Sequence, residues 1–151
     1  MKITSKEFID KERIPQKFTA DGENINPELI IFDIPKETKS LVLVCEDPDA
    51  QKVAGFTWIH WVVFDILVND NKIIIKENSI PGKSGDSTYH KQRYSGPSPS
   101  AGDGIHNYYF KAFALSDMLN LEEMTTLNQI HNAMKDLIIE KAEIIAIYSR
   151  G

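Results

Sequence analysis

Apolar residues gather in three runs of strand length in the middle of the chain. They are SLVLVCE (40–46), FTWIHWVVF (56–64) and HNYYFKAFAL (106–115). Runs of this length that are rich in β-branched and aromatic residues are typical of buried strands. We therefore predict a strand at each run, the first of them ending at the turn that contains Pro48.

The second run is apolar on both sides of the predicted strand. Side chains of a regular strand alternate between its faces. This alternation assigns one face to Phe56, Trp58, His60, Val62 and Phe64, and the other to Ile59, Trp61 and Val63. A strand with two apolar faces lies at the centre of its sheet or between two layers. We expect His60 to share a face with Trp58 and Val62.

Helical spacing appears late in the chain, in TTLNQIHNAMKDLIIE (125–140). Thr126 and Gln129 form a candidate capping box at its start. The apolar positions recur at the intervals of an amphipathic helix, at Ile130, Ala133, Met134, Leu137 and Ile138. The run AEIIAIYSR (142–150) then returns the chain to a sheet. Strands first and one helix near the end predict a mostly antiparallel β fold with a peripheral helix.

A polar connection, residues 76–104, separates the second and third predicted strands. It is rich in Gly, Pro and Ser and is far longer than a hairpin requires. Loops of this length in compact domains are usually functional or disordered. Because this one contains Tyr94 and several turn residues, we predict an ordered binding loop.

Composition narrows the classes of protein to consider. The length of 151 residues suits a single domain, 1–151. A net charge of −5 argues against general nucleic-acid binding, which requires clustered Lys and Arg. No stretch reaches the roughly 20 apolar residues of a membrane span, and the first residues do not resemble a signal peptide. With Cys45 as the only cysteine, no internal disulfide can form, and we expect a cytoplasmic protein.

Several polar groups stand in apolar surroundings. Asp47 and Asp49 flank a proline just after the first strand, and His60 lies within the aromatic one. A buried imidazole is costly unless its nitrogens find partners. A carboxylate at the end of the adjacent strand would raise the pKa of His60 and favour its charged form. If His106 converges on the same place, a positive and partly dry cavity results, and a phosphate or carboxylate would suit it.

Each of these features also has a purely structural interpretation. A histidine in a strand is more often a satisfied core residue than a ligand contact. Asp-Pro-Asp is a common turn sequence. The segment YSGPSPSAG (94–102) would serve as an ordinary surface loop. Taken one at a time, the residues predict only a β domain with a candidate anion pocket.

The order of the motifs carries more information than each motif alone. DPDA is followed by the aromatic strand with its histidine, then by Y-x-G-P-x-P-x-x-G and by H-x-Y-x-F. This order resembles the phosphatidylethanolamine-binding protein family, which includes the Raf kinase inhibitor proteins and short bacterial and archaeal relatives. ADGENINPELIIFDIP (20–35) and AEIIAIYSRG (142–151) also resemble segments of that family. The resemblance extends over nearly the whole chain.

The resemblance implies a fold and a site. The fold would be an antiparallel β-sandwich, in which a large central sheet packs on a smaller one, with peripheral helices near the C-terminus. The site would be a small anion pocket at one end. Residues that match the family's pocket and the loop at its mouth are Asp47, Asp49, His60, Tyr94, Gly96, Pro97, Pro99, His106 and Tyr108.

Two positions depart from the family pattern. Pro99 is followed by Ser100 where the family usually has paired prolines, so the loop is expected to be less rigid. Asn107 stands where an arginine is common between the second histidine and the tyrosine. A positive charge near the rim is thereby missing, which argues against tight binding of large anionic partners.

The leading hypothesis is a soluble, non-enzymatic protein that binds a small phosphorylated or anionic ligand without a cofactor or metal. The alternative is an inhibitor of a protein kinase or protease that acts through the pocket mouth and the long loop. Hydrolysis ranks lower, because no G-x-S-x-G elbow surrounds Ser95, Ser98 or Ser100. A centre of two histidines and one carboxylate also ranks lower, because the spacing is not a local metal signature. A homodimer is a further expectation.

Overall fold

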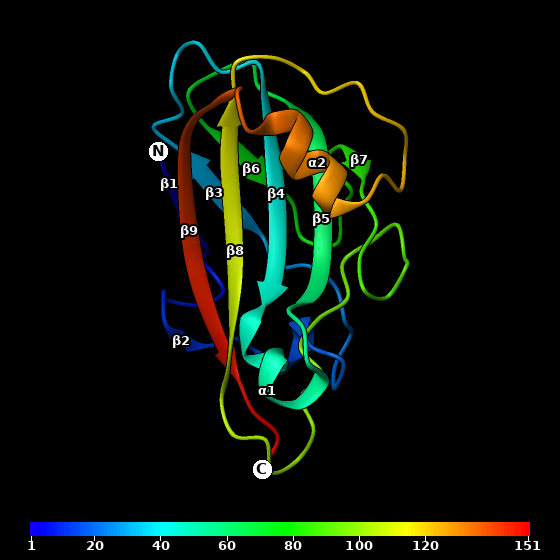
Figure 1. Ribbon diagram of the computed structural model, residues 1–151. Helices are drawn as coiled ribbons and strands as arrows, with labels where there is room; N and C mark the ends of the chain where they lie inside the picture. The colour runs from blue at the N-terminus through cyan, green and yellow to red at the C-terminus, as the bar shows by residue number, and fades with distance from the viewer.

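Two sheets make up the computed structural model, which describes residues 1–151 (Figure 1). The large sheet has six strands, in the order β2-β9-β8-β4-β5-β7, and the small sheet has three, in the order β1-β3-β6. The strands are β1 (Lys2–Thr4), β2 (Glu12–Arg13), β3 (Leu29–Phe32), β4 (Ser40–Asp47), β5 (Trp58–Leu67), β6 (Ile73–Ile75), β7 (Lys83–Ser84), β8 (His106–Leu115) and β9 (Ile138–Tyr148). The helical segments are η1 (Gln16–Phe18), η2 (Pro48–Ala50), α1 (Gln51–Ala54) and α2 (Leu127–Met134).

Every strand pair is antiparallel except the short pair of β2 with β9. The small sheet covers one face of the large sheet and α2 covers the other (Figure 1). This arrangement confirms the predicted β-sandwich and its peripheral helix near the C-terminus. None of the helices has the length and hydrophobicity needed to cross a membrane.

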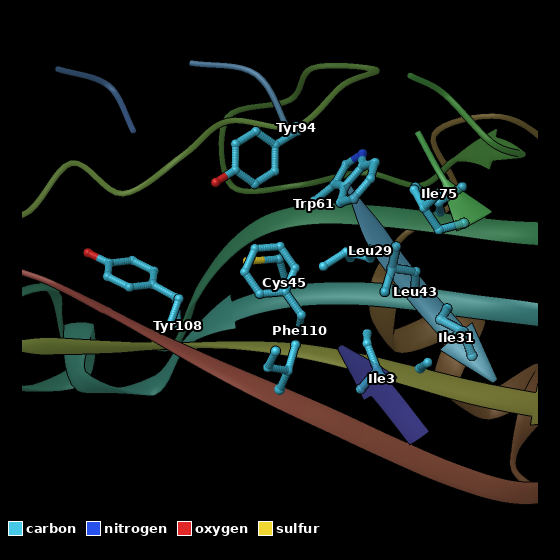
Figure 2. Packing of buried hydrophobic residues seen from close by; sticks show 14 of the residues in the cluster. Ile3, Leu29, Ile31, Leu43, Cys45, Trp61, Ile75, Tyr94, Tyr108 and Phe110 are labelled. Carbon is cyan, nitrogen blue, oxygen red and sulfur yellow. The ribbon is translucent and has the colours of Figure 1, made fainter. Parts of the chain in front are cut away.

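The core consists of two apolar layers on either side of the large sheet. The larger layer lies between the sheets and includes Ile31 of the small sheet with Leu43 and Trp61 of the large one (Figure 2). The smaller layer joins Val44 of β4 to Ile130 of α2. Each large side chain buried in this way contributes roughly 1.5–3 kcal/mol. The central strand β4 therefore has no solvent-exposed face.

A bulge changes the facing of the first residues of β5. Cys45 of β4 pairs with Trp61, but the next residue of β4 pairs with Ile59, so His60 is an extra residue in its strand. The predicted alternation is therefore wrong at this point. Ile59 packs on the α2 side with Val62, whereas His60 and Trp61 both contact side chains of the opposite face. The shared face predicted for His60 and Val62 does not exist.

The late helix is shorter than its apolar spacing predicted. It ends at Met134, and Ile138 already pairs with Leu115 as the first residue of β9. Leu137 nevertheless packs against the smaller apolar layer. The helical spacing therefore predicted correctly that Leu137 is packed on the α2 side, although the helix ends before it. Pairing with β8 determines the backbone conformation from Ile138 onward.

The start of α2 matches the predicted cap, since the hydroxyl of Thr126 accepts a hydrogen bond from the backbone N–H of Gln129. We expect Thr126→Ala to lower the free energy of unfolding by about 1 kcal/mol, because the N–H loses its acceptor. The unfolding midpoint should fall by roughly 2–4 °C, as followed by circular dichroism. Thr126→Ser, which keeps the hydroxyl, should unfold close to the wild type, and an equal loss in both variants would contradict the role of the cap.

Candidate ligand pocket

A cavity of about 240 Å³ lies at the end of the large sheet where β4 ends and β5 and β8 begin. Figure 1 shows this end beside α1. Side chains from these strands, from η2 and α1 and from the long loop line it. They are Asp47, Ala50, Val53, Ala54, Trp58, His60, Tyr89, Ser98, Pro99, Ser100, Asp103, His106 and Tyr108. We call this cavity the pocket.

A buried histidine–aspartate pair forms its floor. Nδ1 of His106 lies 2.6 Å from Oδ2 of Asp47, and the two side chains are only 6% and 4% exposed. Burial raises the pKa of Asp47, and the hydrogen bond from His106 opposes that rise. The imidazole therefore donates Nδ1–H to the carboxylate and keeps Nε2 for another partner. On the pocket side, Nε2 is 3.9 Å from a carboxylate oxygen of Asp103.

One oxygen of Asp47 has no partner. Its Oδ1 is buried and makes no hydrogen bond in the protein. A buried acceptor left without a donor costs about 1–3 kcal/mol, and more when it is charged. Asp47 is a lining residue, so this unsatisfied oxygen belongs to the pocket wall.

His60 is electrically different from His106. Its Nδ1 lies 2.7 Å from the carbonyl oxygen of Ser95, so Nδ1–H donates a hydrogen bond to this backbone oxygen. Burial lowers the pKa of His60 to about 4, and the ring is neutral near pH 7. The prediction that an adjacent carboxylate pairs with His60 and raises its pKa is wrong, because Asp47 pairs with His106 instead.

Aromatic rings enclose the neutral imidazole. The ring centroids of Tyr89 and Tyr108 lie 5.5 Å and 5.3 Å from that of His60. Burial raises the pKa of Tyr108, which keeps its hydroxyl protonated as a donor. In Figure 2 this hydroxyl points away from the aliphatic core residues. The indole N–H of Trp58, also at the pocket, is buried without a hydrogen-bond partner.

Five of the nine predicted site residues line the pocket, namely Asp47, His60, Pro99, His106 and Tyr108. Asp49 does not. Its carboxylate accepts hydrogen bonds from the backbone N–H and the side-chain amide of Asn107, at 2.7 and 2.9 Å. Asp49 therefore ties η2 to the start of β8 and fixes the pocket wall.

The other three predicted residues hold the loop rather than face the pocket. The hydroxyl of Tyr94 donates to the carbonyl of Phe18 at 2.6 Å. A Cβ at Gly96 would lie 2.2 Å from that same carbonyl oxygen, so only glycine fits. The carbonyl of Pro97 accepts from the N–H of Ala20 at 2.9 Å. Tyr94, Gly96 and Pro97 thus clamp the long loop to the segment around η1.

Several lining residues were not predicted from the sequence. They include Trp58, for which only a strand face was predicted, and Tyr89 and Asp103, which belong to the long polar loop. The wall formed by η2 and α1 is too short to leave a helical pattern. Aromatic and acidic residues inside a long loop were the available signal. No group of three His, Cys, Asp or Glu side chains has the arrangement of a metal site.

The low pKa of His60 makes stability depend on pH. The unfolded chain takes up a proton at this histidine below about pH 6.5, whereas the folded chain resists protonation down to about pH 4. The contribution of the neutral ring to stability is therefore complete above about pH 6.5. It is lost as the pH falls from there toward 4, by about 3 kcal/mol in total. We expect His60→Gln to show a shallower loss of stability over this range.

An NMR titration of the imidazole nitrogens is the direct measurement. The His60 ring should remain neutral, with its proton on Nδ1, until the pH approaches 4. A midpoint near or above 6.5 would contradict the burial argument. His90, whose side chain is 75% exposed, provides an internal comparison in the same spectra.

Comparisons with known proteins agree with this architecture. The sequence profile of the family described as phosphatidylethanolamine-binding protein matches residues 4–149. The UPF0098 proteins of Methanothermobacter thermautotrophicus and Aquifex aeolicus are 34% and 36% identical, over 100% and 99% of this chain and 100% and 89% of theirs. The crystal structure of a putative phosphatidylethanolamine-binding protein homologue from Chlamydia trachomatis superposes with a TM-score of 0.90 at 35% identity, covering 99% of this chain and 97% of that one. The chain belongs to the phosphatidylethanolamine-binding protein family.

Proposed function

We propose that the pocket binds a small phosphorylated ligand that also carries a cationic group, as phosphoethanolamine does. The observation that carries this proposal is the buried Asp47 carboxylate, which shares one oxygen with His106 and leaves the other without a partner. One half of this pair offers a donor and the other half offers an acceptor. A ligand with charges of both signs satisfies both.

Hydrogen-bond donors for a phosphate line the pocket. They are the His106 imidazole at Nε2, the hydroxyl of Tyr108 and the hydroxyls of Ser98 and Ser100. Hydrogen bonds to a charged group contribute about 1.5–3 kcal/mol each, roughly twice the value for neutral pairs. Several donors that converge in a partly dry cavity therefore suit a phosphate oxygen.

Acceptors for an ammonium group also line the pocket. Oδ1 of Asp47, the carboxylate of Asp103 and the unprotonated Nε2 of His60 offer lone pairs to a cation. The size of the pocket fits such a ligand. A volume of about 240 Å³ accommodates a head group but not acyl chains, given that a water molecule occupies roughly 30 Å³.

Binding rather than catalysis is the role that these contacts favour. Acyl or phosphoryl transfer by a serine requires a base within hydrogen-bond reach of the hydroxyl. Ser98 is 3.4 Å from Arg150, and the hydroxyl of neither Ser98 nor Ser100 bonds to an imidazole. We therefore assign no catalytic residue.

A protein partner that presents a phosphorylated side chain is the second candidate. Val53 lines the pocket and is 61% exposed. Ile105, directly before the lining residue His106, is 62% exposed. Large apolar side chains exposed beside a polar cavity favour contact with another protein. Inhibition of a protein kinase or protease would act through this rim, and the test below distinguishes it from binding of a free head group.

Titrations with phosphoethanolamine, ethanolamine and inorganic phosphate, followed by thermal unfolding and NMR, test the proposal. At about 100 times the dissociation constant, phosphoethanolamine should add roughly 2.7 kcal/mol to stability and raise the unfolding midpoint by about 5–10 °C. Asp47→Asn should weaken phosphoethanolamine about tenfold, because the ammonium loses its carboxylate. Its affinity for inorganic phosphate should be unchanged or higher, because a negative charge has been removed.

His90→Gln is the matched control, since His90 and Asp86 form an exposed pair at 2.8 Å that does not line the pocket. This variant should bind all three ligands as the wild type does. A wild-type protein that binds none of the ligands contradicts the proposal. Binding of a phosphoserine peptide but not of phosphoethanolamine would favour the protein partner, and Val53→Asp should then weaken the peptide selectively.

A further inference from the structure

Arg150 lies just beyond β9, at the mouth of the pocket. The carboxylate of Asp21 holds its guanidinium, with Nε 2.9 Å from Oδ2 and Nη2 2.8 Å from Oδ1. The same Nη2 is 3.4 Å from the hydroxyl of Ser98, which lines the pocket. No other lysine or arginine side chain bonds to a lining residue. Arg150 is therefore the one such side chain that is hydrogen-bonded to the pocket lining.

The guanidinium has donors to spare. It carries five N–H groups in a planar fork that matches phosphate oxygens. The contacts with Asp21 and Ser98 involve Nε and Nη2 only. Nη1 makes no hydrogen bond in the protein, so two donors beside Ser98 remain for a ligand. The side chain is 33% exposed.

The pocket itself lacks a permanent positive charge. No lysine or arginine lines it, whereas Asp47 and Asp103 both do. A phosphomonoester carries a charge of about −1.5 to −2 at pH 7. His106 alone, already bonded to Asp47, does not balance that charge. A phosphate at the mouth therefore requires a cation from outside the lining.

The field of Arg150 reaches the pocket hydroxyls. Burial raises the pKa of both Tyr89 and Tyr108, and the positive charge of Arg150 is among the groups that oppose the rise. The same charge would act on a phosphate oxygen bound near these hydroxyls.

Asp21 is itself held in place. The preceding residue, Ala20, donates its N–H to the carbonyl of Pro97, and the hydroxyl of Tyr148 donates to Oδ2 of Asp21 at 2.7 Å. The carboxylate is thus fixed relative to both the pocket loop and the end of β9. An arginine held on a fixed carboxylate loses less side-chain entropy when it binds a ligand.

We infer that Arg150 is a specificity-determining residue that recognises the phosphate of a phosphomonoester at the pocket mouth. Nη1, with Nη2 in support, donates to the phosphate oxygens while Asp21 holds the opposite edge of the guanidinium. The inference rests on the proposed function and adds the charge class of the ligand. Arg150 is expected to select dianionic phosphomonoesters over phosphodiesters and over uncharged analogues.

Calorimetry at pH 7.5 tests the inference. It measures the affinities for phosphoethanolamine and for its diester counterpart, glycerophosphoethanolamine, in three variants: Arg150→Gln, Arg150→Lys and Arg13→Gln. Arg150→Gln should weaken the monoester about tenfold and the diester about threefold or less. Arg150→Lys should fall between the wild type and Arg150→Gln, because it keeps the charge but not the fork. Arg13 stacks 4.4 Å from the Tyr148 ring and bonds to Ser149, outside the pocket, so Arg13→Gln should stay within about twofold of the wild type.

The outcomes separate the two levels of the argument. If the wild type binds the monoester and Arg150→Gln binds it equally well, the role of Arg150 is overturned and the pocket proposal stands. If Arg13→Gln loses as much as Arg150→Gln, general electrostatics explains the effect and the inference is also overturned. If the wild type binds neither ligand, both proposals fail. Unfolding midpoints of the variants, measured alongside, show whether a loss of affinity accompanies a loss of fold. If Arg150→Gln is destabilised, the affinity of Arg150→Lys for the monoester decides whether Arg150 has this role.

Discussion

The register in which β4 pairs with its two neighbours is the constraint on which the pocket depends. Asp47 is the last residue of β4 and pairs with Trp58 of β5, while Glu46 pairs with Tyr109 of β8. These pairings bring the end of one strand beside the beginnings of two others. A slip of one residue would send each of these side chains to the opposite face of the sheet. The buried apolar layers on both faces make such a slip costly, so the core maintains the geometry of the site.

The bulge at His60 shows why part of this geometry was hidden in the sequence. Alternation along the aromatic run predicted a strand at the centre of its sheet or between two layers. β5 lies between the two apolar layers, second from the edge of its sheet. The same alternation placed His60 beside Val62, on the face that α2 covers. An extra residue in the ladder turns the ring to the opposite face, where it meets Tyr108. A bulge depends on the partner strand, and hydrophobic periodicity within one strand does not reveal it.

What the sequence could predict follows the same division between local and long-range effects. The three apolar strands and the cap of α2 depend on neighbouring residues, and they were predicted. The last turn of the predicted helix became strand because Ile138 pairs with Leu115, a partner far away in the chain. The choice of which histidine meets Asp47 is likewise a matter of tertiary structure. Because the carboxylate of Asp47 is hydrogen-bonded to His106, His60 donates to the backbone carbonyl of Ser95 instead. Burial then lowers the pKa of His60 and keeps the ring neutral.

The motif that opens with Tyr94 combines both kinds of information in a few residues. Its first half, Tyr94 to Pro97, faces the η1 segment and makes contacts that require a hydroxyl, a missing Cβ and a free carbonyl. Its second half, Ser98 to Ser100, lines the pocket. Matching residues to a motif treats both halves as binding residues, whereas the contacts divide them into an anchor and a wall. The anchor also fixes the loop that carries Asp21, so the residues that hold the wall in place bring Arg150 to its rim.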